Sequence, residues 1–328
     1  MEKLSVIVPV YNEEKVLEDF FNRMTVVMDK LDMDSEVIFV NDGSQDNSLN
    51  LIRSFSLKDS RVAFINLSRN FGKEAAMSAG LDFAEGDAVV IIDADLQDPP
   101  ELIPEMISLW RQGYDNVYGQ RIDRHGESKT KRATAYLFYR VIQRIGRFRI
   151  PKDAGDFRLL SRRAVLALRR LPENNRFMKG LFAWIGYSGI AVKYCRDIRY
   201  GGHTKFNYWK LWNFALDGIA SFTTLPLKLS SYVGLFIAIF SFAYGFYIVI
   251  RTLIFGDPVA GFPTIITVIL FLGGIQLLFL GIFGEYLGRM YDETKSRPIY
   301  LIEEIHGVTN PECFRCNSFK KTKKYPLI

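Results

Sequence analysis

The sequence predicts an α/β domain with a mostly parallel sheet and helices on both faces, followed by interfacial helices and two transmembrane helices. Three observations carry this prediction. Short apolar runs alternate with helix-like runs in the first part of the chain, polar residues follow the first four of these runs, and two long uncharged stretches occupy the last third. The 328 residues provide ample length for the core of one large or two smaller domains.

The apolar runs of the first part predict strands because they are short, rich in β-branched residues and bounded by turn residues. They are Leu4–Val10, Glu36–Asn41, Val62–Leu67, Ala88–Asp93 and Asn116–Gly119. The runs between them predict helices at Lys15–Leu31, Ser48–Phe55, Lys73–Ala84 and Glu101–Gln112. Because no G-x-G-x-x-G follows the first strand and no Walker A motif occurs, neither a dinucleotide oxidoreductase nor a P-loop NTPase is expected.

Later segments have less regular patterns. Arg158–Leu171 and Phe177–Trp184 indicate helical or mixed structure, and Ile299–Ile305 indicates a short strand-like run. Cys313 and Cys316 form a lone C-x-x-C, which lacks the further ligands that a zinc site needs. We therefore interpret the end of the chain as a mobile tail.

Two uncharged stretches, Leu229–Ile250 and Pro258–Gly284, are long enough to cross a bilayer, which takes about 20 residues. A pair of buried core helices is the alternative, but neither stretch has a polar face. The segment that connects the two stretches contains a single basic residue, Arg251. In contrast, basic residues lie before the first stretch and after the second. These flanking residues are Lys228, Arg289, Lys295 and Arg297. The positive-inside rule therefore predicts a multi-pass protein of the inner membrane with both termini in the cytoplasm.

The segment before the first uncharged stretch, Phe206–Leu225, carries Tyr208, Trp209 and Trp212. Because Trp and Tyr favour the membrane interface, this segment predicts an amphipathic helix on the bilayer, with an ordinary packed helix as the alternative. The expected organisation is a cytoplasmic α/β domain at residues 1–205, an interfacial region at 206–228, a transmembrane hairpin at 229–290 and a cytoplasmic tail at 291–328.

The formal net charge is +6, and basic residues cluster in one stretch of the chain. Its members include Lys129, Lys131, Arg132, Arg140, Arg144, Arg147 and Arg149. Basic stretches interleaved with aromatic residues suit nucleic acid, anionic lipid or phosphate substrates equally well. The charge by itself therefore leaves these partners open.

The segment Val90–Pro100 is the most informative part of the chain. A buried strand-like run ends in Asp93 and Asp95, and Gln97 follows. Two carboxylates one residue apart repel each other unless a cation lies between them. A hard divalent cation that grips a nucleotide diphosphate fits this need. The alternative is an Asp-rich turn that caps the helix at Glu101–Gln112.

Polar residues also follow the other three strand-like runs of this region. Tyr11 and Glu13 follow the first run, Asp42 follows the second and Lys73 follows the third. Each set could be a turn with a helix cap. Because the carboxyl ends of parallel strands meet at one sheet edge, the sets together predict a nucleotide pocket.

The segments PVYNEE, VNDGSQDNS, LSRNFGKEAAMSAG and DADLQDPPELI resemble the nucleotide-sugar domain of family 2 glycosyltransferases, which has the GT-A fold. The segments YGQR, LFYR, DAGDFRLLSRR, RFMKGLFAWIGY and RYGGHTKF are similar to the polyprenyl-phosphate branch of that family, which includes dolichol-phosphate mannose synthases. The two uncharged stretches resemble those of the bacterial bactoprenol glucosyltransferases and undecaprenyl-phosphate aminoarabinose transferases. The sequence lacks the Q-x-x-R-W of processive synthases, so a polysaccharide synthase is not expected.

This resemblance implies roles for the matched residues. Donor-binding residues would be Pro9, Tyr11, Glu13, Asp42, Lys73, Asp93, Arg121, Arg199 and Lys205, with Asp42 reading the base. Ligands of a Mg²⁺ or Mn²⁺ ion would be Asp95, Gln97 and Asp93. Catalytic residues would be Asp95, Asp156 and Asp153, and the acceptor phosphate would meet Lys131, Arg132 and Arg140.

The activity that the resemblance implies is inverting transfer of a hexose, preferably glucose, from a UDP-sugar to polyprenyl (undecaprenyl) phosphate at the cytoplasmic membrane face. A phosphate monoester has a second pKa of about 6, so the acceptor is largely ionised at neutral pH. We therefore expect Asp156 to orient the acceptor or to stabilise the sugar cation rather than to remove a proton. The expected partners are the donor, the lipid and the membrane, in a homo-oligomer, with a tetramer suspected, and no nucleic acid.

Several alternatives stay open. The donor could be a UDP-N-acetylhexosamine, a UDP-aminoarabinose derivative or GDP-mannose. The acceptor could be diacylglycerol, whose hydroxyl would need a true general base. A non-catalytic subunit that binds or transports a lipid carrier is the alternative from another class, although the intact set of Asp93, Asp95 and Gln97 argues against it.

Overall fold

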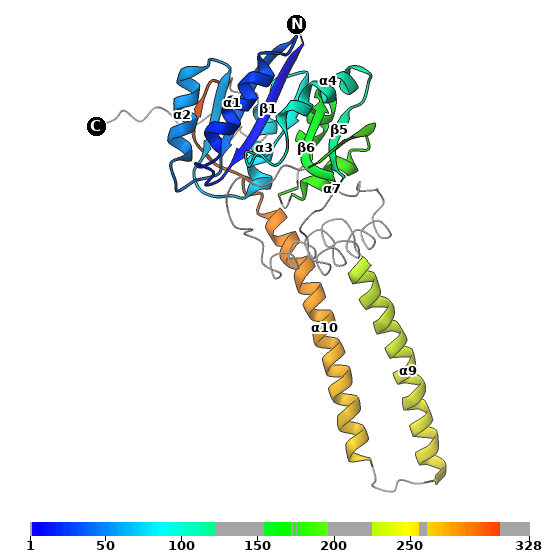
Figure 1. Ribbon diagram of the computed structural model, residues 1–328. Coiled ribbons are helices and arrows are strands. Elements are labelled where there is room, and N and C mark those ends of the chain that lie inside the picture. The colour runs from blue at the N-terminus through cyan, green and yellow to red at the C-terminus, as the bar shows by residue number, and fades with distance from the viewer. Residues whose placement is uncertain are drawn as a thin grey trace, which may run out of the picture. The chain divides into compact units, whose positions relative to one another are not determined.

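The computed structural model describes residues 2–122, 154–171, 173–174, 176–195, 225–255 and 261–308. The chain divides into two compact units, one formed by residues 1–211 with 297–328 and the other by residues 212–296. The first unit is an α/β domain, and the described part of the second is a pair of long helices (Figure 1).

The described strands of the first unit form one eight-stranded sheet in the order β7-β5-β6-β4-β1-β2-β3-β8. The strands are β1 (Lys3–Val10), β2 (Asp34–Asn41), β3 (Val62–Leu67), β4 (Ala88–Ile91), β5 (Asn116–Arg121), β6 (Ala154–Ser161), β7 (Gly189–Tyr194) and β8 (Ile302–His306). The pairs β4–β1, β1–β2, β2–β3 and β5–β7 are parallel, whereas β6 and β8 pair antiparallel with their neighbours. The structure thus confirms the predicted mostly parallel sheet.

Helices cover both faces of this sheet because successive side chains of a strand point to opposite faces. The helices are α1 (Leu17–Met28), α2 (Ser48–Lys58), α3 (Lys73–Phe83), α4 (Ile103–Arg111), preceded by the short 3₁₀ helix η1 (Pro100–Leu102), α6 (Arg162–Arg169) and α7 (Met178–Trp184). On one face Phe20 of α1 and Phe55 of α2 pack with Phe39 of β2, all fully buried or nearly so. Each such ring contributes about 1.5–3 kcal/mol by burial. On the other face α3 approaches β1 so closely that a Cβ on Gly80 would lie 2.3 Å from Ile7 Cγ2.

The structure differs from the sequence-based prediction in its later strands. The segment predicted as helical or mixed at Arg158–Leu171 is divided, with β6 ending at Ser161 and α6 beginning at Arg162. β7 was not predicted. The strand-like run predicted at Ile299–Ile305 corresponds to β8, which begins at Ile302 and pairs with β3 as part of the sheet. The end of the chain predicted as a mobile tail, with Cys313 and Cys316, lies outside the described residues.

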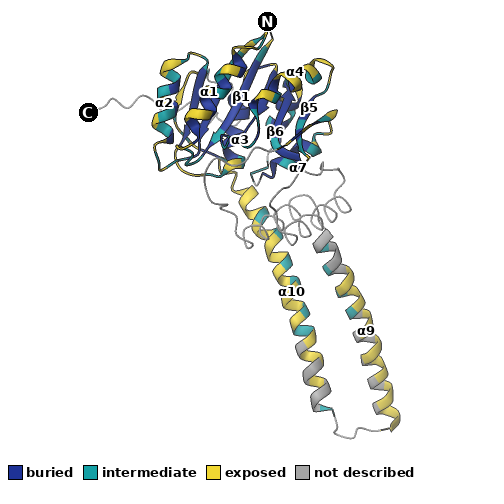
Figure 2. Cartoon of the chain, viewed as in Figure 1, coloured by how far each residue is buried: buried dark blue, intermediate teal, exposed yellow. Residues whose placement is uncertain are grey.

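The second unit contains α9 (Leu225–Phe255) and α10 (Phe262–Thr294). The first predicted uncharged stretch is therefore helical throughout, and the second is helical from Phe262. Their described apolar side chains lie largely exposed, with Phe236 at 72% and Leu277 at 71% (Figure 2). Among the described residues, the stretch Phe271–Thr294 is long and apolar enough to cross a membrane. Most of the predicted interfacial helix, residues 206–224, lies outside the described part of the chain.

Candidate active site

The candidate site lies along the edge of the sheet where the parallel strands end. β1, β2, β3 and β4 run in the same direction, so their carboxyl ends and the loops that follow lie along one edge. β6 runs the opposite way and therefore begins at this edge. In the β4–β6 register Ile91 lies opposite Arg158, which brings Asp93, two residues beyond Ile91, near Asp156, two residues before Arg158.

The loops that follow β1 and β2 are tied together by hydrogen bonds. The Asn12 amide donates to Ser44 Oγ over 3.0 Å, and the Gln45 amide donates to Asn12 Oδ1 over 2.8 Å. Asn12 has a φ of 54°, a left-handed conformation that Asn tolerates better than most residues. These bonds hold the predicted pocket residues Tyr11 and Glu13, both partly buried, on a fixed loop beside the end of β1.

Asp42 holds the loop after β3 through hydrogen bonds to its backbone. Its side chain is 3% exposed, and its two oxygens accept the amides of Phe71 at 2.7 Å and Gly72 at 2.9 Å. Burial raises the pKa of Asp42 above its ordinary value, while the two amide bonds act in the opposite direction. In this structure Asp42 therefore shapes the loop after β3, and its predicted role in reading a base stays a prediction.

Gly43, in the loop after β2, allows the loop after β3 to pack closely against it. Its φ is +65°, and a Cβ there would lie 2.5 Å from the backbone carbon of Arg69. The Arg69 guanidinium lies over the Phe71 ring, 4.1 Å from its centroid. The chain can therefore fold the loops after β2 and β3 against each other only with glycine at this position.

Lys73, at the start of α3, joins two predicted site carboxylates. Its Nζ lies 2.7 Å from Asp93 and 2.7 Å from Asp156 Oδ2. Asp156 Oδ1 is buried and accepts no hydrogen bond from the described residues. The structure thus brings together Lys73, Asp93 and Asp156, three of the residues that the sequence predicted for the site.

Electrostatics reinforce this bridge. Burial acts to raise the pKa of Asp156, but the charges of Lys73 and Lys179 outweigh it and hold that pKa well below its usual range. Burial acts to lower the pKa of Lys73, but the charges of Asp156 and Asp93 raise it above its ordinary value. Lys73 is therefore a fixed cation and Asp156 a fixed anion at neutral pH, which makes Asp156 a weak base.

Two further charged residues near Asp156 were missed from the sequence. Glu74 accepts the Met178 amide at 3.1 Å, and burial, with the nearby charge of Asp156, raises the pKa of Glu74 to about 7. Arg158 is 4% exposed and lies over the Phe182 ring at 3.7 Å, and its burial lowers the pKa to about 10. The sequence could have indicated Arg158, because it is a charged residue within an apolar strand-forming run. Glu74 could not be recognised in this way, because an acidic residue is common in the first turn of a helix.

Arg121 reaches the same edge from the end of β5. Its Nε donates to Tyr194 Oη over 3.4 Å, and its Nη2 lies 3.8 Å from Asp98 Oδ1. Tyr194 in turn donates a short hydrogen bond to Asp98 Oδ1. Burial acts to lower the pKa of Arg121, but these two partners raise it overall. The predicted donor residue Arg121 is therefore held by Asp98 and Tyr194, neither of which was predicted.

The residues predicted to hold a divalent cation fit that role by their chemistry. Asp93, Asp95 and Gln97 are partly buried and alternate with the buried Ala94 and Leu96. They offer carboxylate and amide oxygens, the ligands that Mg²⁺ and Mn²⁺ prefer. The described residues contain no cluster of three or more His, Cys, Asp or Glu that could hold a metal by itself. In proteins Mg²⁺ is commonly held by one or two carboxylates together with waters and substrate phosphate oxygens.

The remaining predicted residues are placed as follows. Pro9 is partly buried and is the residue before the last one of β1. Asp153, Lys131, Arg132, Arg140, Arg199 and Lys205 lie outside the described residues.

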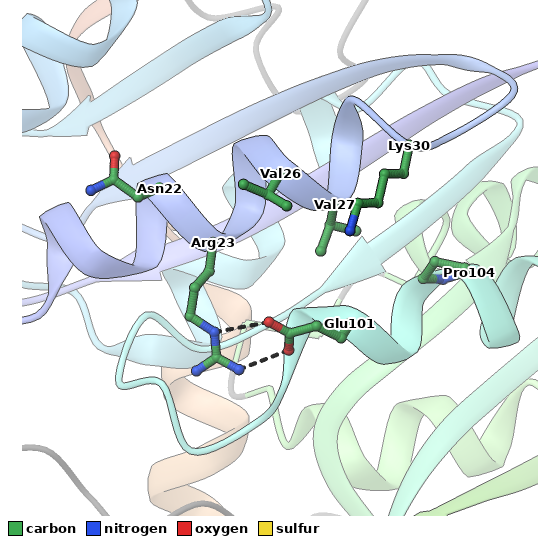
Figure 3. Close-up of a pocket in the computed structure, with 7 residues that line it drawn as sticks. All are labelled: Asn22, Arg23, Val26, Val27, Lys30, Glu101 and Pro104. Carbon is green, nitrogen blue, oxygen red and sulfur yellow. Dashed lines mark hydrogen bonds and ion pairs between the residues drawn. The ribbon is translucent and has the colours of Figure 1, made fainter.

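A pocket beside α1 is separate from the residues that the sequence predicted for the active site (Figure 3). Its walls come from α1 and from the η1–α4 segment, where Arg23 forms a two-pronged ion pair with Glu101. None of the predicted site residues lines it.

Comparison with known proteins gives two family matches. Residues 5–169 match the model of glycosyl transferase family 2, and residues 225–290 match the GtrB C-terminal hairpin. An uncharacterized glycosyltransferase of Synechocystis sp. is 51% identical over 93% of this chain and 96% of that protein. The SfII prophage-derived bactoprenol glucosyl transferase of Shigella flexneri is 46% identical over 93% of this chain and 98% of that protein.

Among solved structures, glucosyl-3-phosphoglycerate synthase from Mycobacterium tuberculosis, in complex with Mn²⁺, UDP-glucose and phosphoglyceric acid, matches with a TM-score of 0.46 and 22% identity. The match covers 67% of this chain and 78% of that chain. This likeness is too distant to bear on the chemistry of the present site.

Proposed function

The chain belongs to glycosyl transferase family 2, and we propose that it transfers a hexose, preferably glucose, from a UDP-sugar to polyprenyl phosphate with inversion at the anomeric carbon. The observation that carries this proposal is the convergence of Asp93, Asp156 and Lys73 beside Asp95 at one sheet edge. The name of the Shigella flexneri relative, a bactoprenol glucosyl transferase, supports a polyprenyl acceptor and a glucosyl donor.

Arg121 and the Asp95–Gln97 loop would hold the donor diphosphate. We assign the divalent cation to Asp95 and Gln97, because the Asp93 carboxylate is already paired with Lys73. When bound, Mg²⁺ or Mn²⁺ supplies positive charge against the diphosphate oxygens as the leaving group departs. The guanidinium of Arg121 would add two-pronged donation to the same group. Tyr11 and Glu13 would line the nucleoside pocket on the loop after β1.

Asp156 would act as a fixed negative charge beside the reacting carbon. Its pKa is held low by Lys73, so it is poorly suited to remove a proton. A phosphate monoester acceptor is ionised at neutral pH and needs no general base. The pairing with Lys73 therefore favours a phosphate acceptor over diacylglycerol, whose hydroxyl would require a base.

The second unit supports a membrane location for this reaction. Residues 225–290 match the GtrB C-terminal hairpin, and the described apolar side chains of α9 and α10 are largely exposed, as expected for helices solvated by lipid. We propose that both helices span the inner membrane and that both termini lie in the cytoplasm. We further propose a homo-oligomer, with a tetramer as the expected size, which native mass spectrometry in detergent would measure.

The test is a donor panel with purified full-length protein, Mg²⁺ and undecaprenyl phosphate. UDP- and GDP-sugars are offered one at a time, and labelled lipid is measured. We expect UDP-glucose to give the highest rate, the Asp156→Asn variant to be slowed on the order of 10²-fold or more, and diacylglycerol to give no product. Labelled diacylglycerol, or no labelled lipid with any donor, would refute the proposed function.

A further inference from the structure

Asp98 is a buried carboxylate that lies beside Arg121, a predicted substrate-binding residue. It is 1% exposed, and a buried carboxylate is tolerated only with a cation or strong hydrogen-bond donors beside it. Arg121 Nη2 lies 3.8 Å away and Tyr194 donates its hydroxyl proton to Oδ1. The phenol also accepts from Arg121 Nε, so Tyr194 bridges the carboxylate and the guanidinium. The three side chains form one network, which we call the Arg121 seat.

Two glycines leave space for the Arg121 seat. A Cβ on Gly119 would lie 2.8 Å from Tyr194 Cε1 and 3.1 Å from Phe157 Cδ1. A Cβ on Gly155 would lie 3.3 Å from Arg121 Nη2. The Tyr194 ring is further fixed by Phe157, whose centroid lies 6.1 Å away in an edge-to-face arrangement. These neighbours restrict the guanidinium, and the Arg121 side chain is still 27% exposed.

The Arg121 seat is joined directly to the Asp95–Gln97 loop, because Asp98 follows Gln97. Leu96, within this loop, has a φ of 58° and is 3% exposed. A left-handed conformation is strained for leucine and persists only where the surroundings enforce it. On either side of this turn Asp95 and Gln97 are partly buried, whereas Asp98 is buried beside Arg121.

We propose that Asp98 and Tyr194 are positioning residues that aim Arg121 at the donor diphosphate and keep it in register with the Asp95–Gln97 loop. The inference rests on the proposed function for the identity of the ligand. It adds that the two anchors of the diphosphate, the metal-binding loop and the arginine, are held as one rigid unit by Asp98.

The test is a double-mutant cycle on the full-length protein in nanodiscs. Donor kcat/KM and the affinity for UDP, or for GDP if the donor panel selects it, are measured for wild type, Tyr194→Phe, Arg121→Ala and the double variant. Tyr194→Phe removes one hydroxyl and keeps the ring. We expect it to lower donor kcat/KM and nucleotide affinity about 10-fold, to leave the acceptor KM unchanged, and to have less than about a 2-fold effect once Arg121 is absent.

The matched control is Tyr187→Phe, at an exposed tyrosine outside the network, which should match wild type. Asp98→Asn should lower donor kcat/KM and nucleotide affinity as Tyr194→Phe does. If Asp98→Asn fails to fold, the double-mutant cycle of Tyr194 and Arg121 still tests the inference. An equal effect of Tyr194→Phe with and without Arg121 would overturn the inference. If the wild-type protein binds UDP but glycosylates no lipid, the proposed function is refuted. The double-mutant cycle measured by nucleotide affinity then still tests this inference. A wild-type protein that binds neither nucleotide would overturn both.

Discussion

The ammonium of Lys73 lies 2.7 Å from Asp156 Oδ2, across a sequence separation of 83 residues. The same nitrogen lies 2.7 Å from Asp93, so it pairs with two carboxylates, one in the loop after β4 and one in β6. Only about two fifths of the Lys73 side chain is exposed, at 41%, and Asp156 is 14% exposed, so solvent screens this pair incompletely. The bridge fixes the charge of Asp156 and its orientation together.

Replacing Lys73 with methionine should slow sugar transfer on the order of 10²-fold or more, because the carboxylate of Asp156 loses its orientation and its counter-charge. Lys73 now holds the pKa of Asp156 low, so without it that pKa rises. Activity that needs ionised Asp156 should then be lost at a higher pH as the solution is acidified. The measurement is the pH profile of kcat/KM.

The control for this variant is Lys193→Met, at an exposed lysine of β7, which should keep the wild-type profile. Lys73→Arg should recover part of the rate because it restores the positive charge. An acid limb of Lys73→Met that coincides with that of wild type would show that Lys73 does not control the ionisation of Asp156.

Chelation of divalent ions should abolish transfer, and Mg²⁺ or Mn²⁺ should restore it. In Asp95→Asn the ion loses a charged ligand, so the metal concentration for half-maximal activity should rise on the order of 10- to 100-fold. Titration of Mn²⁺ in the presence of UDP, followed by electron paramagnetic resonance, measures this without turnover. Asp19→Asn on the exposed surface of α1 is the matched control, and full activity in a chelator would contradict the metal assignment.

Glu74 should make the protein less stable as the pH rises. Burial raises its folded-state pKa to about 7, above the ordinary value of 4.5, so its contribution is fully present below pH 4.5 and is lost as the pH rises through 7. Relative to Glu74→Gln, wild type should lose up to roughly 3 kcal/mol across this window. Thermal unfolding of both proteins between pH 4.5 and pH 8 measures the difference. Parallel curves for the two proteins would refute it.

Gly43→Ala should damage the site more than Gly113→Ala. Both glycines have positive φ, at +65° and +100°, so both substitutions carry a backbone strain of about 1–3 kcal/mol. A Cβ on Gly43 would also overlap the Arg69 backbone at 2.5 Å, whereas a Cβ on Gly113 meets no atom within 4 Å. We expect both variants to unfold at a lower temperature, Gly43→Ala by the larger amount, and nucleotide binding to weaken only in Gly43→Ala. Equal losses of stability and of nucleotide binding in both variants would show that the close packing of the loops after β2 and β3 has no role in the site.

Local pattern was enough to predict the central strands and the residues that follow them. The run Val62–Leu67 is a strand with the predicted bounds, and Asp93 and Asp95 follow β4 as expected. A buried parallel strand reads as a continuous apolar run, and parallel strands end at one edge, so both the fold class and the region of the site follow from short-range information. The same reasoning placed Lys73 at the start of α3.

The tertiary structure alone decided which of these residues meet. The antiparallel pairing of β6 with β4 brings Asp156 to Lys73, and the parallel pairing of β7 with β5 brings Tyr194 to Arg121. Asp98, Glu74 and Arg158 acquire their importance from burial next to these pairs, and β8 joins the sheet from the far end of the chain. Such contacts depend on which distant strands pair, and the continuous apolar run of each buried strand does not encode its partner.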